Sequence, residues 1–115
     1  MSEIKRLHAG ARYSEASIHA GVVYLAGQVA VGGGTTIESQ VAEVLASIDQ
    51  LLAEAGTSKA RILMAQIYLA DMADYAGLNS VWDRWVGAAP PSRATVEAKL
   101  AKPEWKVEIV VTAAV

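Results

Sequence analysis

Two charged side chains near the C-terminus are the strongest candidates for chemistry. Glu108 is the one carboxylate in the apolar run 107–115, and a charge among apolar residues is costly unless it is paired or has a task. Arg93 follows Pro90-Pro91-Ser92 at the start of a predicted strand. Its planar guanidinium can hold a carboxylate by two hydrogen bonds. Together they would supply a cation for an anionic ligand and an acid or base.

Each residue also has an explanation that needs no function, because exposed ion pairs are common on sheet edges. The candidate partners are Lys99 and Lys106 for Glu108, and Asp71 and Glu97 for Arg93. The sequence leaves both alternatives open.

Other chemistry has little support in the sequence. The chain has no cysteine, which excludes disulfides, thiolate zinc sites and thiol catalysis. His8 and His19 have no metal-ligand spacing and are expected on the surface or in loops, so neither a metal nor a cofactor is predicted. Residues 32–34 are glycines, but no Lys-Ser or Lys-Thr follows, so a flexible turn is favoured over a phosphate loop.

Composition restricts the class of protein. A chain of 115 residues has room for one domain, which we place at 1–115. The formal net charge of -2 argues against nucleic acid as the main partner. We find no apolar stretch long enough to span a membrane and no signal core at the N-terminus, and therefore expect a cytoplasmic protein.

The apolar periodicity predicts elements in the order ββαβαββ. The helix from Ile37 is the clearest, with Thr35 and Glu38 as a capping box and Gly56 as its end. A second helix, capped by Asp74, is ended by Pro90. The predicted strands are 16–20 and 22–29, joined by a tight turn at Gly21, then 61–70, 93–100 and 106–113.

This order predicts a two-layer α+β fold: a single, mostly antiparallel sheet covered on one face by two helices. Residues 21–31 carry no charge, and residues 61–70 carry none after Arg61. Because the helices cover only one face, we expect a closed ring of subunits to bury the other.

If the last two strands pair around Lys102-Pro103, Glu108 lies roughly opposite Glu97. Arg93 is then about 14 Å further along, at roughly 3.4 Å per residue. A small ligand does not bridge that gap easily, so we expect a composite site with residues from neighbouring chains.

Four segments together resemble the Rid family of reactive-intermediate deaminases, also called YjgF-like proteins, over nearly the whole chain. They are Leu25-Ala26-Gly27-Gln28, Tyr75-Ala76-Gly77-Leu78-Asn79, Pro91-Ser92-Arg93-Ala94-Thr95-Val96-Glu97 and Lys106-Val107-Glu108-Ile109. The last two are the specific part, whereas the Gly-Gln pair alone is weak.

The resemblance implies a chorismate-mutase-like fold and a homotrimer with a central barrel of sheets and clefts between subunits. It also implies hydrolysis of enamines and imines, such as 2-aminoacrylate, 2-iminopropanoate and 2-iminobutanoate, to 2-oxo acids and ammonia without a cofactor. The chemistry suits the two charged residues, since a 2-imino acid needs a cation for its carboxylate and an acid/base group to direct water.

The resemblance also implies roles for particular residues. Arg93 resembles the carboxylate-binding arginine, and Glu108 the water-activating glutamate. The implied substrate-binding residues are Tyr13 for its hydroxyl, Gly27 for its backbone, Asn79 near the site and Thr95 for its hydroxyl.

Two positions depart from the family pattern. Ala26 replaces a residue that often carries a hydroxyl, which removes one hydrogen bond to substrate. Thr95 stands where well-known members have cysteine, so thiol regulation is lost while a hydroxyl is kept.

Two other functions compete with imine hydrolysis. One is a trimer that binds small carboxylates such as 2-oxo acids without catalysis, with Arg93 for recognition and Glu108 structural. The other is RNA cleavage, which has been attached to relatives, and the acidic charge balance counts against it.

Overall fold

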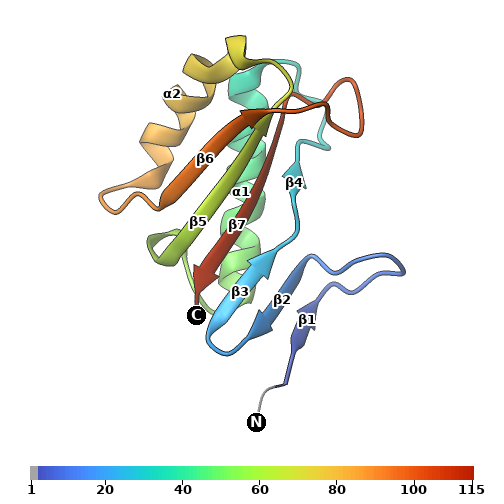
Figure 1. The fold of residues 1–115 in the computed structure, drawn as a ribbon, viewed down its shortest axis with the longest axis vertical. Coiled ribbons are helices and arrows are strands. Elements are labelled where there is room, and N and C mark those ends of the chain that lie inside the picture. Colours follow the sequence, from blue (N-terminus) through green and yellow to red (C-terminus); the bar gives the residue numbers. More distant parts are fainter. Residues whose placement is uncertain (1–2) are drawn as a thin grey trace.

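The computed structural model describes residues 3–115, as one sheet with two helices packed on one of its faces (Figure 1). The helices are α1 (Ile37–Glu54) and α2 (Tyr75–Val86). Two short 3-10 helices are also present: η1 (Lys59–Arg61) directly before β5, and η2 (Met72–Asp74) directly before α2. The strands are β1 (Lys5–Leu7), β2 (Ala16–His19), β3 (Val22–Leu25), β4 (Gln28–Val29), β5 (Ile62–Leu69), β6 (Ser92–Glu97) and β7 (Val107–Ala114). The predicted two-layer α+β class is confirmed.

The strand order is β1-β2-β3-β7-β5-β6, with β4 also paired to β7. All pairs are antiparallel except β5 with β6, which is parallel. The predicted pairing of the last two strands is therefore wrong, because β5 lies between them. The physical reason is polarity. β7 buries its alternate side chains, which suits a central strand, whereas β6 carries Arg93 and Glu97 on one face and is therefore stable only at the edge of the sheet.

The core lies between the sheet and α1. Every apolar residue of the predicted stripe on this helix is buried: Ile37, Val41, Val44, Leu45, Ile48, Leu51 and Leu52. On the sheet, the alternate residues Val107, Ile109, Val111 and Ala113 of β7 are also buried. The apolar face of the helix α1 and the apolar face of the sheet thus pack against each other in one layer.

The ends of both helices differ in detail from the prediction. The N-cap of α1 is Thr36, whose side chain accepts from the Ser39 N–H at 3.1 Å, so the capping box is one residue later than the predicted one. Gly56 follows the helix with φ of +86°, as predicted for its end. Asp74 is the N-cap of α2 without a side-chain bond, and α2 ends at Val86, before the prolines.

The β2–β3 hairpin turns at Ala20 and Gly21, which both have positive φ. This is the geometry that a two-residue hairpin turn requires. The predicted strand 22–29, however, is interrupted. Tyr24 pairs with Thr112 and Gln28 with Ile109, so four steps along one chain match three along β7 and one extra residue forms a bulge.

The face of the sheet away from the helices is uncovered in the single chain. On it lie Tyr24 of β3 and Val96 of β6, which are 53% and 44% exposed, with Val110 of β7 between their strands. None of the helices in the described part of the chain is both long and apolar enough to cross a membrane. Apolar side chains of the open sheet face are thus exposed to solvent in the single chain.

Gln40 is a buried amide that joins three segments. Its Nε2 donates to the carbonyls of Gly34 and Glu104, both at 2.9 Å, and its Oε1 accepts from the Lys106 N–H at 2.8 Å.

We expect Gln40→Met to lower the free energy of unfolding by about 3 kcal/mol, because three backbone groups lose their partner. Urea unfolding measures this. Gln50→Met on the exposed side of α1 is the control, expected within about 0.5 kcal/mol of the parent, and equal effects of the two changes would contradict the assignment.

Candidate functional site

Glu108 lies on the uncovered face of the central strand β7, because its neighbours Val107 and Ile109 point into the core. Its half-buried side chain lines a hollow of about 340 Å³. The other residues lining this hollow are Tyr13, Ala26, Gly27, Val29 and Trp105. Tyr13 and Gly27, both predicted to bind substrate, therefore lie together with Glu108.

The bulge between β3 and β4 shapes this hollow. The extra residue of the bulge shifts by one which residues point to each face of the sheet. Val29 is therefore the register partner of Glu108 and lies on the same face as the carboxylate. A Cβ atom on Gly27 would overlap the Glu108 carboxyl group. Only glycine admits the carboxylate so close to the backbone of this bulge.

Arg93 is held by neutral groups on α2. It donates from Nη1 to Asn79 Oδ1 at 2.9 Å and from Nη2 to the Tyr75 hydroxyl at 3.1 Å. Its guanidinium carbon is also 5.3 Å from the Trp82 ring centroid. These contacts fix the plane of the guanidinium without neutralising its charge.

Thr95 lies two residues beyond Arg93 on the same side of β6. Its Oγ1 is buried and has no hydrogen-bond partner within residues 3–115. A buried hydroxyl without a partner is unfavourable, and Thr95 therefore differs from Arg93, whose side chain is hydrogen-bonded.

The two charged residues lie on opposite faces of the sheet. Arg93 is the register partner of Ala65, and Glu108 that of Tyr68. Positions three apart along β5 face opposite ways. Their backbones are separated by about 10 Å across two strand spacings and about 10 Å along the strands, so the predicted separation holds although the predicted register does not.

Neither Glu108 nor Arg93 forms an ion pair with the lysines or carboxylates that the sequence offered as partners in the described residues. The one side-chain ion pair among residues 3–115 joins His8 and Glu54, at 2.6 Å. Glu97 instead accepts from the Met72 N–H at 3.0 Å. In the same part of the chain, no group of three His, Asp or Glu side chains is arranged to hold a metal ion.

Three aromatic residues at these clusters were not predicted as site residues. Tyr75 and Trp82 fall at the apolar spacing of the second predicted helix, which favours a place in the core, yet both contact Arg93. The spacing of Tyr75 four residues before Asn79, on one helix face, is a signal that could have found Tyr75. Trp105, three residues before Glu108, gave no periodic signal because it lies in the loop before β7.

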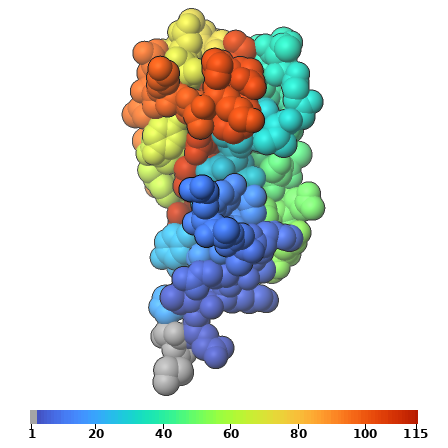
Figure 2. Space-filling model, turned by 90° about the vertical axis from the view of Figure 1, so that its right-hand side faces the viewer, coloured from blue at the N-terminus to red at the C-terminus, as the bar shows by residue number. Residues whose placement is uncertain are grey.

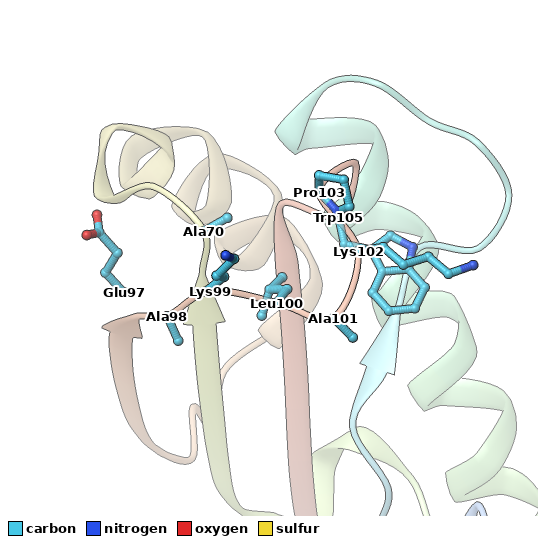
Figure 3. A pocket seen from close by; sticks show the side chains of 9 residues that line it. All are labelled: Ala70, Glu97, Ala98, Lys99, Leu100, Ala101, Lys102, Pro103 and Trp105. Atoms are coloured by element: carbon cyan, nitrogen blue, oxygen red, sulfur yellow. The ribbon is translucent and has the colours of Figure 1, made fainter.

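A larger hollow of about 710 Å³ lies at the end of the sheet and contains none of the predicted site residues (Figure 3). Its wall is mostly the loop between β6 and β7, with Glu97 and Lys99 at one end and Trp105 at the other (Figure 3). The smaller hollow, by contrast, is lined by three of the predicted site residues, Tyr13, Gly27 and Glu108.

Residues 3–115 match the family model described as "Endoribonuclease L-PSP". The chain is 57% identical to a "RutC family protein" of Haemophilus influenzae, over 96% of this chain and 97% of that one. It is 43% identical to the "RutC family protein YoaB" of Escherichia coli, over 97% and 98%.

Solved structures give the same relation. A YjgF family protein, NMB1025 from Neisseria meningitidis, is similar with a TM-score of 0.95 and 50% identity, over 97% of this chain and 94% of that one. YyfA from Yersinia pestis, described as a Rid family protein of unknown function, has a TM-score of 0.87 and 31% identity, over 93% and 90%. With a match along nearly all of its length, the chain belongs to the endoribonuclease L-PSP family, which is the family of the YjgF, RutC and Rid proteins.

Proposed function

We propose that this protein hydrolyses 2-imino acids to 2-oxo acids and ammonia, without a cofactor, in clefts between subunits. The observation that carries the proposal is the division of the site into two halves. One half is a fixed, unneutralised arginine at the sheet edge, and the other is a carboxylate in a hollow on the opposite face. Two chains that meet with the edge strand β6 of one against the uncovered sheet face of the other would bring the halves together.

In the proposed site, Arg93 of one chain binds the substrate carboxylate by two parallel hydrogen bonds. Glu108 of the neighbouring chain accepts a proton from water, whose oxygen attacks the carbon of the C=N bond. Glu108 returns this proton to the nitrogen, which gives the neutral carbinolamine. As the C–N bond breaks, Glu108 carries the hydroxyl proton to the nitrogen, which departs as ammonia. The hydroxyl oxygen becomes the carbonyl of the 2-oxo acid.

The remaining predicted residues have supporting roles in this proposal. Tyr13, on the rim of the Glu108 hollow, offers a hydroxyl to the substrate or the water. Gly27 leaves room for a ligand beside its backbone, and Asn79 orients Arg93. The buried Thr95 hydroxyl lies two residues beyond Arg93 on the same face of β6, where it would bond the substrate carboxylate beside the guanidinium.

The composite site requires an oligomer, and we expect a homotrimer. The uncovered sheet face, with exposed Tyr24 and Val96, supplies the apolar surface for it. Light scattering at micromolar concentration should give three times the chain mass of 12.1 kDa. A monomer would remove the basis for a shared site.

Arg93→Lys should lower kcat/KM for 2-iminobutanoate by at least about a hundredfold, although the charge is kept. An ammonium is a point charge and cannot reproduce the planar two-bond grip or the bonds to Asn79 and Tyr75. Ammonia release with semicarbazide trapping of the imine measures this. Arg84→Lys, at an exposed position on α2, is the matched control, and parental activity of Arg93→Lys would assign Arg93 a structural role.

Glu108→Gln should lower kcat by about a hundredfold or more while binding of 2-oxobutanoate is retained. The amide keeps the shape but cannot accept the proton of water. Calorimetry and turnover together separate the two effects, with exposed Glu104→Gln as control. Normal turnover in Glu108→Gln would exclude it as the base. A parental protein that binds 2-oxobutanoate without releasing ammonia from any imine would instead be a carboxylate-binding trimer.

A further inference from the structure

Trp105 forms one wall of the hollow that holds Glu108. The residue is half-buried in the loop before β7, and it lines both this hollow and the larger one at the end of the sheet. Figure 2 shows the N-terminal segment, in blue, and this C-terminal loop, in orange, on the same side of the molecule. Trp105 thus lies where several hollows meet, and it shares the hollow of Glu108 with Tyr13.

The loop holds this wall in place. The Trp105 N–H donates to the Lys102 carbonyl at 3.2 Å, and buried Gln40 bonds the residues on either side, Glu104 and Lys106. The Lys102 ammonium lies 5.2 Å from the indole centroid, and its side chain runs alongside the ring in Figure 3. The position of the ring is thus set before any ligand binds.

The rest of the hollow is apolar apart from Glu108. Val29 and Ala26 contribute only hydrocarbon, and Tyr13 contributes a ring with one hydroxyl. Ala26 also removes the bulk and the hydroxyl that a serine or threonine would place there. The lining offers no cation and no amide side chain to a polar substituent of a ligand.

Resting on the proposed function, we infer that Trp105 is a specificity-determining residue that selects 2-imino acids with branched aliphatic or aromatic side chains. When Arg93 holds the carboxylate and Glu108 faces the C=N carbon, the substrate's third substituent is its side chain. The indole, Val29 and Tyr13 bury that group. Each added methylene in such a pocket typically changes kcat/KM by about ten- to two-hundredfold.

The test compares imines made in situ by an amino-acid oxidase from alanine, leucine and phenylalanine. The parental protein should have at least about tenfold higher kcat/KM for the leucine imine than for the alanine imine. Trp105→Ala should lower this ratio about tenfold, through the leucine and phenylalanine imines, and change the alanine imine by less than about threefold. Leu100→Ala is the matched control, since Leu100 lines only the larger hollow, and its ratio should equal the parental one. An equal loss for every imine, or an unchanged ratio, would overturn the role of Trp105.

Binding of the corresponding 2-oxo acids separates this inference from the hydrolysis itself. Calorimetry should show tighter binding of 4-methyl-2-oxopentanoate than of pyruvate, and Trp105→Ala should remove the difference. If no imine is turned over but this binding preference depends on Trp105, the proposed hydrolysis is wrong and the role of Trp105 in side-chain selection is supported. If imines are turned over with a leucine-to-alanine ratio that does not depend on Trp105, the proposed hydrolysis is supported and the role of Trp105 is wrong. Trp105→Phe keeps an aromatic wall and should retain most of the preference, which guards against a misfolded alanine variant.

Discussion

The central position of β7 is the constraint on which the rest of the structure depends. Its alternate residues Val107, Ile109, Val111 and Ala113 are almost completely buried against the helices. Because a strand alternates its faces, the residues between them must point to the uncovered side. Glu108 is therefore on the open face by necessity, and a shift of register by one residue would place a carboxylate in the core.

The same argument from polarity places Arg93. It faces the helices from β6, in the same direction as the core residues of β5. Such a cation is tolerated because β6 is the edge strand and one face of α2 supplies an amide, a hydroxyl and an indole. The fold thus places Arg93 and Glu108 on different faces of the sheet, Glu108 on the central strand and Arg93 on the edge strand.

Periodicity in the sequence predicted both helices and most of the strands, but it missed the short edge strand β1 and did not predict which strands are neighbours. The stripe of α1, the hairpin at Gly21 and the alternation of β7 follow from local patterns. The order of β5, β6 and β7 does not, because residues 98–106 are long enough either to form a hairpin or to cross the end of β5. Gly27 is a local sign of the bulge before Gln28, because an isolated glycine in a strand often marks one, but it does not give the register of the residues that follow. Arg93 and Glu108 were found by residue type, whereas Tyr75 and Trp105 were missed because their partners are distant in sequence.

The choice of partners for Arg93 explains how a strong cation can stay available for a ligand. A carboxylate neighbour would orient the guanidinium but would also neutralise it and compete with an anionic ligand. Asn79 and Tyr75 supply orientation through neutral acceptors, and they use only two of the five N–H donors. The charge and the remaining donors are left for a carboxylate, and binding it requires no ion pair to be broken first. Orientation without neutralisation is what a site for a small anionic molecule needs, and it accounts for an amide, rather than an acid, at position 79.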